Sequence, residues 1–349
     1  MPSMGLLKLR NFWTKLTAWE YWPLYIVYIP VFAYWLYLGL RAGAIFFFSA
    51  ANPGIKYGGL ISASKKKILD LVPSLYLPKT ILLRQPVQKR LVMDEMEKLK
   101  LQFPVILKPD LGERGWKVEK INTNKELENY LNAVKTDIIL QEYLDLPFEA
   151  GVFYYRMPDQ ERGIVSSVVL KELLHIIGDG KSSLKELILK KPRARIQFRK
   201  LSETWSEQWD SIPENGERVE LQPIGNHNRG TTFLNGNHLI DEELINTFDA
   251  ISKQIKGFYY GRFDVRCKDE DALKRGEVKI MELNGAASEP AHIYHPGFPI
   301  SKGYSALFKH WKMLYRISKA NHKKGVPYLK FREGLYALSI SGRLADQGL

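Results

Sequence analysis

GRFDVRC, residues 261–267, and VKIMELNG, residues 278–285, are the two stretches that decide the fold prediction. Because side chains alternate between the two faces of a strand, Arg262, Asp264 and Arg266 share one face of the first stretch. Glu282 and Asn284 share a face of the second stretch. If the two stretches pair as a hairpin, one face is apolar and faces a core. The other face gathers carboxylates, one amide and two guanidinium groups.

That polar face has a chemical interpretation. Hard divalent cations prefer carboxylate and amide oxygens, and guanidinium groups suit phosphate oxygens or a developing oxyanion. An exposed sheet face with ordinary salt bridges is the alternative interpretation of the same pattern. The hairpin therefore indicates a metal and phosphate site.

Upstream, FPVILKPDLGERGWKV (103–118) places Lys108 at the end of an apolar strand and follows it with a glycine-containing turn. A loop whose N–H groups close over phosphates needs small residues, and the lysine adds a positive charge. The alternative is an ordinary hairpin turn.

A third stretch, IILQEYLDLPFEAGV (138–152), carries Glu142 after an apolar strand and Glu149 seven residues later. Residues 144–147 between them have the character of a hinge. A nucleotide pocket between two lobes needs backbone groups for the base and a carboxylate for the ribose hydroxyls. Two solvated glutamates at a strand end are the alternative.

In this order and spacing, the three stretches resemble the ATP-grasp superfamily, over roughly residues 64–296. Residues 103–118 are similar to the lid strand and phosphate loop of that superfamily, and residues 261–285 to its metal-binding hairpin. The spacing of Glu142 and Glu149 is similar to that of the adenine hinge and ribose carboxylate in D-alanine–D-alanine ligases. GDGKSSLKELI (178–188) is similar to a turn and helix of amide-forming ATP-grasp ligases. The resemblance implies an α+β fold in which two α+β lobes clasp ATP.

The resemblance also implies roles for individual residues. The phosphate-binding lysines are Lys65, Lys108 and Lys171. The lid loop is shaped by Gly112, Arg114 and Gly115, adenine is contacted by Glu142 and Leu144, and the ribose by Glu149. Magnesium, or alternatively manganese, is held by Asp264, Glu282 and Asn284. Arg262 and Lys171 are the implied catalytic residues, with Arg262 facing the acyl phosphate or the tetrahedral intermediate.

Two polar segments beside the hairpin are candidates for the acceptor substrate. They are IGNHNRGTTF (224–233) and NGAASEPAHIYHPG (284–297), and their candidate residues are His227, Asn228, Arg229, Ser288, Glu289, His292 and Tyr294. For any one histidine, a structural role is the stronger interpretation, and a metal site at His292 and His295 is weakly supported because no cysteine lies nearby.

Composition bounds the class of partner. Among 349 residues, 51 Lys and Arg stand against 38 Asp and Glu, a net charge of +13, which favours an anionic partner. Nucleic acid is disfavoured because basic patches interleaved with aromatic residues are absent outside the N-terminus. The single cysteine, Cys267, excludes an internal disulfide framework. Oligomeric state stays open.

The N-terminus is expected to be membrane-associated. Residues 21–40, YWPLYIVYIPVFAYWLYLGL, contain no charge, and 20 such residues are about the minimum for crossing a bilayer. Positive residues on both sides, Pro30 and scattered aromatic residues favour a re-entrant or interfacial segment, so we expect residues 1–43 to bind lipids at the cytoplasmic face of the membrane, with a single span as the alternative. A buried aromatic-rich core helix is a further alternative.

Five regions follow from these features. They are a membrane-associated segment (1–43), a truncated N-terminal lobe (44–85), a small ATP-grasp lobe with the lid (86–145), a large lobe with the metal site (146–318) and a C-terminal tail (319–349). Residues 44–48 are expected to form a buried strand, and residues 193–218 a loop.

The predicted function is an ATP- and Mg²⁺-dependent ligase that activates a carboxylate as an acyl phosphate and joins it to an amine or, less favoured, a thiol. One alternative is a small-molecule kinase on the same fold, which would make a stable phosphoester. The other is a non-enzymatic basic protein of the membrane surface, which does not require Asp264, Glu282 and Asn284 to converge.

Overall fold

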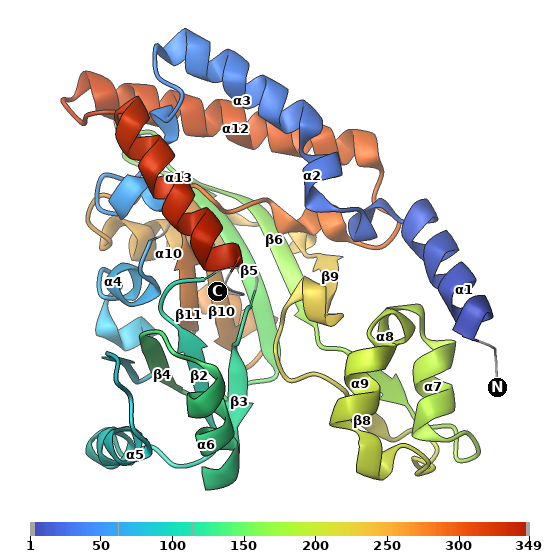
Figure 1. Cartoon of the computed structure of the whole chain (residues 1–349). Helices are drawn as coiled ribbons and strands as arrows, with labels where there is room; N and C mark the ends of the chain where they lie inside the picture. The colour runs from blue at the N-terminus through green and yellow to red at the C-terminus, as the bar shows by residue number, and fades with distance from the viewer. Residues whose placement is uncertain (1–3, 62, 113–114, 347–349) are drawn as a thin grey trace.

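The structure, a computed structural model, describes residues 4–61, 63–112 and 115–346. Two antiparallel sheets, one of four strands and one of five, organise this part of the chain, and a further two-stranded ribbon stands apart (Figure 1). The observed α+β architecture with two sheet-based lobes agrees with the predicted fold class.

The small lobe is built on the four-stranded sheet, in the order β1-β4-β2-β3. Alternation along β2 and β4 sends Val105, Leu107 and Leu140 into the lobe's core, whereas Lys108 and Gln141 lie on the opposite face. Its elements are β1 (Thr80–Leu83), α5 (Lys89–Lys98), β2 (Val105–Pro109), β3 (Glu119–Ile121), α6 (Asn124–Ala133) and β4 (Ile138–Glu142). Of these strands, β2 and β4 are the apolar strands predicted before the glycine-containing turn and before Glu142.

Before the small lobe, the chain runs through short helices. Ser64 caps α4 by accepting a hydrogen bond from the Lys67 backbone N–H. The predicted strand over residues 44–48 is wrong, because Phe46, Phe47 and Phe48 form a turn and a 3-10 helix whose rings are buried together. The short elements here are η2 (Phe47–Ala50), η3 (Lys56–Gly59), α4 (Lys65–Leu69) and η4 (Ser74–Tyr76).

The large lobe is built on the five-stranded sheet, in the order β11-β10-β5-β6-β9. One face of this sheet packs against two helices, burying Phe263 and Val265 with Phe248 and Leu273. The strands and helices are β5 (Phe148–Tyr155), β6 (Ile164–Glu172), β9 (Thr232–Asn235), α10 (Glu242–Lys253), β10 (Tyr260–Cys267), α11 (Glu270–Arg275) and β11 (Lys279–Asn284). The predicted hairpin is thus confirmed, although its connection contains the helix α11.

The other face of the five-stranded sheet is divided in two. At one end, Phe153 and Tyr260 are buried under α12 (Ile300–Lys323). Towards the other end, the same face carries Asp264, Arg266 and Glu149. Aromatic packing therefore holds one half of this face and leaves the other half to charged groups.

A helical insertion follows β6, and it replaces the loop predicted over residues 193–218. Ser183 begins α7 with a capping box to Glu186, and Pro192 begins α8, so both helices start at residues suited to helix N-termini. The elements are β7 (His175–Ile177), α7 (Leu184–Lys190), α8 (Pro192–Ile196), α9 (Phe198–Thr204), η5 (Ser206–Gln208), β8 (Arg218–Glu220) and η6 (His227–Arg229). Leu174, Leu187 and Leu201 form the small separate core of the insertion. After β9, η7 (Asn237–Leu239) belongs to the large lobe.

The prediction of a membrane-associated N-terminus is wrong. In the described residues, no helix combines the length and the apolar character needed to cross a membrane. The uncharged stretch is divided instead, because Pro23 precedes α2 and Pro30 lies in the first turn of α3. Its elements are α1 (Met4–Thr17), η1 (Trp19–Tyr21), α2 (Leu24–Val27) and α3 (Ile29–Ala42).

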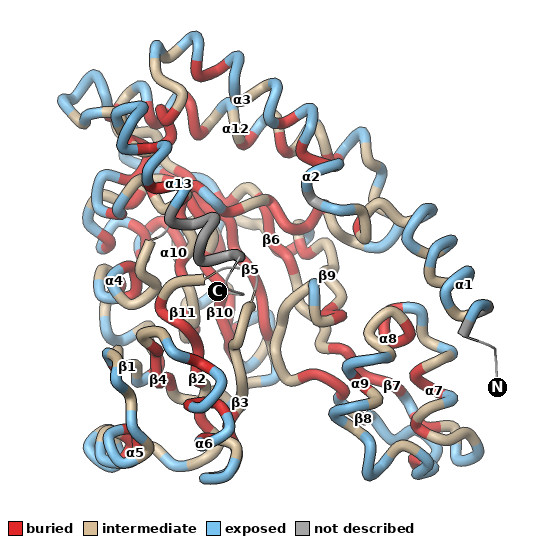
Figure 2. The backbone as a smooth tube through the Cα atoms, in the orientation of Figure 1, coloured by how far each residue is buried: buried red, intermediate tan, exposed pale blue. Residues whose placement is uncertain are grey.

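Helix α3 lies along α12, as Figure 1 shows, and its buried residues include Val31 and Leu38. Figure 2 shows buried positions in red along α3 where it faces α12. The partner that organises this segment is therefore a helix some 270 residues away in sequence. Localisation at the membrane face and lipid binding through residues 1–43 consequently lose the feature on which they were based. The last elements are η8 (Ala291–Tyr294) and α13 (Phe331–Asp346).

Candidate functional site

The β10–β11 hairpin places the predicted metal ligands side by side. Its register pairs Asp264 with Glu282 and Arg262 with Asn284. Directly paired residues project from the same face of a sheet, so two carboxylates and one amide converge. The Nδ2 of Asn284 donates to Asp264 (3.0 Å).

Asp264 is buried and surrounded by positive charge. Arg262 donates to both of its carboxylate oxygens (3.0 Å each), and the Lys171 Nζ lies 3.3 Å away. Burial alone would raise the pKa of Asp264, but the charges of Arg262 and Lys171 hold it at about 2. Asp264 is therefore ionised at any physiological pH.

Gly151 makes this cluster possible. A Cβ at Gly151 would lie 3.0 Å from an Asp264 carboxylate oxygen, 3.1 Å from Arg262 Cδ and 2.8 Å from Val169. Any side chain there would push into the space that the charged groups share. Our sequence interpretation missed Gly151, whose signal was a glycine in the middle of an otherwise apolar strand.

From the small lobe, Lys108 reaches the same place. Its Nζ donates to Gln141 Oε1 (3.0 Å) and, across the lobes, to the carbonyl oxygen of Met281 in β11 (3.1 Å). Burial lowers the pKa of Lys108 to about 8, with the charge of Lys65 adding to the effect and that of Glu282 opposing it. An anionic ligand beside Lys108 would therefore stabilise its charged form.

The predicted phosphate loop lies beside Lys65, whose Nζ donates to the carbonyl oxygen of Gly112. At the far side of the loop, Arg229 donates to the carbonyl oxygens of Gly115 (3.0 Å) and Val118 (2.8 Å). Arg229, predicted as a substrate residue, contacts the loop instead. Arg114 lies outside the described residues.

The predicted hinge residues have different surroundings. The Glu142 carboxylate accepts the backbone N–H of Lys79 (3.0 Å). The carbonyl oxygen of Leu144 accepts from Arg266 (2.8 Å). Glu149 is buried between two cations, with Arg266 Nε at 2.9 Å and Lys171 Nζ at 3.1 Å.

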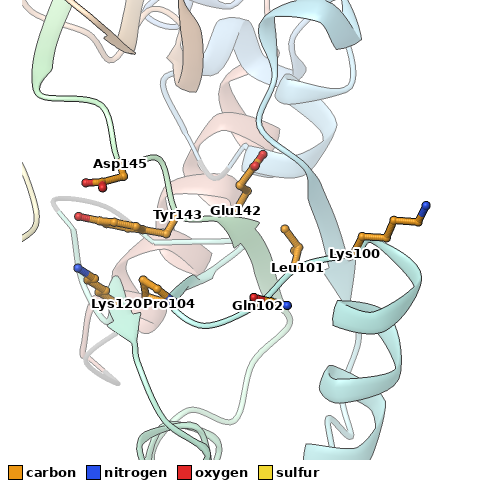
Figure 3. Close-up of a pocket in the computed structure, with 8 residues that line it drawn as sticks. All are labelled: Lys100, Leu101, Gln102, Pro104, Lys120, Glu142, Tyr143 and Asp145. Carbon is orange, nitrogen blue, oxygen red and sulfur yellow. The ribbon is translucent and has the colours of Figure 1, made fainter.

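A hollow of about 470 Å³ lies outside the hinge (Figure 3). The Lys120 Nζ lies 4.0 Å from the centre of the Tyr143 ring there, and the Glu142 carboxylate points away from both. The hollow is lined by Lys100, Leu101, Gln102, Pro104, Lys120, Glu142, Tyr143 and Asp145.

Three predicted substrate residues come together near the hairpin. Arg262 donates to the carbonyl oxygen of Glu289 (3.4 Å), and the Tyr294 hydroxyl donates to the Glu289 carboxylate (2.5 Å). The Tyr294 ring lies 5.6 Å from the ring of His227. Burial and the charge of Arg193 lower the pKa of His227 to about 3, so the ring is neutral.

The other candidates lie elsewhere. The Ser288 hydroxyl hydrogen-bonds to the carbonyl oxygen of Gly285 within its own turn. His292 is buried against Ser167 (2.7 Å), and burial lowers its pKa to about 4, which fits the structural interpretation given to any one histidine. His295 accepts the backbone N–H of Asn235 (3.1 Å), and Asn228 accepts at its carbonyl oxygen from Gln197.

Sequence reasoning missed the N-terminal contribution to this region. Glu20 is buried and accepts from Arg193 (2.6 Å), which also donates to His227 (3.4 Å). The Trp19 ring lies 5.5 Å from that of Tyr294, and the Tyr21 ring 6.3 Å from that of His227. The segment expected at a membrane thus flanks the candidate acceptor residues.

The donor set fits a divalent cation. Asp264 and Glu282 can supply carboxylate oxygens and Asn284 an amide oxygen, and the Asp264 carboxylate is paired with the cations of Arg262 and Lys171. Among the residues that the structure describes, no three His, Cys, Asp or Glu side chains form a metal-holding group, so the amide is needed to complete this set.

Comparison with known proteins bears on these residues. Residues 63–152 match the RimK-like ATP-grasp domain family. No curated protein matches the chain in sequence.

Among solved structures, the chain is similar to VanG D-Ala:D-Ser ligase from Enterococcus faecalis (18% identity, TM-score 0.42, covering 72% of this chain and 61% of that one). It is also similar to a bifunctional glutathione synthetase from Pasteurella multocida (16% identity, TM-score 0.35, covering 70% of this chain and 36% of that one). A third similar structure is a D-alanine–D-alanine ligase from Bacillus anthracis (15% identity, TM-score 0.40, covering 75% of this chain and 67% of that one). The chain therefore spans less than two thirds of the first two proteins.

The family match includes Lys65, Lys108 and the whole hinge to Glu149, and it agrees with the resemblance seen in the sequence. Residues 63–152 are therefore assigned to the ATP-grasp superfamily through their match to the RimK-like domain family.

Proposed function

We propose that this protein is an ATP- and Mg²⁺-dependent ligase that activates a carboxylate as an acyl phosphate and joins it to an amine. The ATP-grasp assignment supports nucleotide binding between the lobes. The cluster of Lys108, Lys171, Arg262, Asp264 and Glu282 supports phosphoryl chemistry, because it combines cations for phosphates with oxygens for a metal.

In this proposal, Lys65, Lys108 and Lys171 bind the phosphates. Gly112 and Gly115 let the loop backbone approach them, since both have positive φ values (131° and 71°) that favour glycine. Glu142 and Leu144 contact the base and Glu149 the ribose. Lys171 exchanges Glu149 and Asp264 for phosphate oxygens when the nucleotide binds.

Asp264, Glu282 and Asn284 would hold Mg²⁺, which when bound offsets the negative charge of the phosphates. Because Asp264 is ionised throughout the physiological range, its oxygens need no deprotonation before they bind a cation.

The reaction requires two displacements. A carboxylate oxygen of the first substrate attacks the γ-phosphorus, the bond to the β,γ-bridging oxygen breaks, and ADP leaves. The amine nitrogen then attacks the acyl carbon, the C–O bond to phosphate breaks, and the amine loses a proton to solvent. Arg262 holds the oxyanion of the tetrahedral intermediate, so catalysis is mainly positioning and electrostatic stabilisation.

The acceptor would lie against Glu289, Tyr294 and His227. Arg193 can only donate a hydrogen bond, so the Nε2 of the neutral His227 accepts it and the ring proton resides on Nδ1. The acceptor substrate would therefore meet one carboxylate, that of Glu289, and one neutral N–H donor, the Nδ1 of His227.

The observation that carries the proposal is the contact between lobes, in which Lys108 of the small lobe lies at the backbone of the metal hairpin. The test is incubation with MgATP, hydroxylamine and a panel of carboxylic acids, followed by mass spectrometry. A ligase yields an acyl hydroxamate and free phosphate. A phosphoester would establish the kinase alternative, and absence of nucleotide binding by calorimetry would contradict both.

A further inference from the structure

Arg266 at the end of β10 makes contacts that neither the resemblance nor the proposed chemistry assigns. Its Nε and a terminal nitrogen lie 2.9 and 2.8 Å from the same oxygen of Glu149, and its other terminal nitrogen donates to the carbonyl oxygen of Leu144 (2.8 Å). Both side chains are less than a tenth exposed. One guanidinium thus joins the predicted ribose carboxylate to the hinge.

Glu149 has a second cation, and the two cations differ. Lys171 contacts Glu149 Oε1 (3.1 Å) but also Asp264 (3.3 Å), so it is shared between two carboxylates. Arg266 contacts Glu149 alone among carboxylates of the described residues. When phosphates take Lys171, Oε1 becomes free to accept a ribose hydroxyl, and Arg266 still pairs Oε2. A buried carboxylate left without any cation would be costly.

The surroundings restrict where Glu149 can turn. A Cβ at Gly225 would lie 2.0 Å from Glu149 Oε1, so the backbone of residue 225 closes one side. Because Leu144 is held by the same guanidinium, the carboxylate and the hinge keep a fixed relation to each other. The planar guanidinium group of arginine has several N–H donors and can contact the carboxylate and the hinge carbonyl at once, whereas the lysine side chain has a single nitrogen.

We infer that Arg266 is a positioning residue for the nucleotide, which orients Glu149 toward the ribose hydroxyls and fixes the hinge through Leu144. This inference rests on the proposed function, since it requires a nucleotide in the cleft. It assigns ribose selectivity to an arginine that acts through a carboxylate.

The test compares ATP with 2′-deoxyATP and 3′-deoxyATP by titration calorimetry in Mg²⁺. The wild type should bind ATP about 10- to 100-fold more tightly than the deoxynucleotide that lacks the contacted hydroxyl, the range for one hydrogen bond to a charged group. Glu149→Gln should reduce this ratio strongly. Arg266→Gln should reduce it to within about threefold, because the carboxylate is no longer oriented.

Two further variants guard against a folding defect. Arg266→Lys keeps a charge beside Glu149, and Glu149→Gln with Arg266→Gln removes both members of the buried pair. In the Glu149→Gln background, adding Arg266→Gln should leave the ratio unchanged. Arg275→Gln, at an exposed arginine paired with Glu277 in the same hairpin, is the matched control and should retain the wild-type ratio.

Each outcome decides a separate point. A folded Arg266→Gln or Arg266→Lys variant with the wild-type ratio overturns the inference, as does a wild type that binds ATP without selectivity for either hydroxyl. A further change of the ratio in the Glu149→Gln background would show that Arg266 does not act through Glu149. If the wild type binds no ATP, the proposed function itself fails.

Discussion

Two buried charged clusters in this protein differ in how their members are shared. On the five-stranded sheet, Lys171 is paired with both Glu149 and Asp264. Each of these two carboxylates has a second cation, Arg266 for Glu149 and Arg262 for Asp264. At the N-terminus, Glu20 pairs with Arg193 alone among the cations of the described residues, and this pair joins η1 to α8. A carboxylate with two cations can give one of them up to a ligand and still remain paired. A carboxylate with a single cation would be left as an unpaired buried charge. The first arrangement suits binding and the second suits joining segments.

The largest effect that tests this contrast is on stability. Glu20→Ala leaves Arg193 buried without its carboxylate, so the free energy of unfolding should fall by about 3–5 kcal/mol. MgATP affinity should stay within about twofold, because binding lies in the other cluster. Urea denaturation and calorimetry measure the two quantities.

Lys89→Ala serves as the control for Glu20→Ala, because the Lys89–Glu128 pair is exposed and should contribute less than about 1 kcal/mol. Equal losses in the two variants would refute the distinction between a joining pair and a surface pair.

The next largest effect is on catalysis. Glu282→Gln should lower ATP turnover by about 10²–10³-fold, the range for loss of one electrostatic contribution at a reacting centre. The melting temperature should hardly change, since Glu282 forms no ion pair with the described residues. Turnover like that of the wild type in the folded variant would remove Glu282 from the metal site.

A smaller effect concerns phosphate binding. Lys108→Ala and Lys65→Ala should each weaken ATP binding about 10- to 100-fold, as expected for a hydrogen bond to a charged group. Lys100→Ala, an exposed lysine beside the hollow, is the control. Nucleotide-dependent thermal stabilisation that is unchanged in both Lys65 and Lys108 variants would argue against this site.

Lys108 also gives a pH signature. Its pKa of about 8 means that it loses its charge as pH rises through 8, so ATP affinity should fall across that range. Because phosphate favours the charged form, binding near pH 8 should take up a proton. Calorimetry in buffers of different ionisation enthalpy measures this uptake, which should be absent from Lys108→Ala.

The smallest effect is local. Ser64→Ala removes the N-cap of α4 and a hydrogen bond to Asp110 (3.0 Å), and should cost about 1 kcal/mol of stability. A much larger loss, with ATP binding abolished, would show that α4 contributes more to the nucleotide site than its cap.

The two regions also differ in what their sequences could reveal. Alternation of apolar and polar residues predicted the β10–β11 hairpin, because strand faces follow from local order. Residues 21–40, in contrast, contain only a run of uncharged residues, which does not indicate what the segment packs against. The residues that organise it, such as Leu307 and Leu314 of α12, lie far along the chain and carry no local signal.

Individual site residues show the same limit. Asp264, Glu282 and Asn284 could be grouped from their spacing, but the contact between Arg266 and Leu144 depends on how two segments approach each other. The Glu20–Arg193 pair likewise joins residues 173 positions apart. Local patterns therefore predicted the types of groups present, and the tertiary fold determined which of them are paired.

The most direct measurement is a crystal structure with Mg²⁺ and a non-hydrolysable ATP analogue. The account predicts the γ-phosphate between Lys108 and the β10–β11 hairpin, a cation bound by Asp264 and Glu282, and Lys171 moved from Glu149 to a phosphate. A nucleotide in the hollow beside Lys100 and Lys120, with Lys171 still between Glu149 and Asp264, would contradict it.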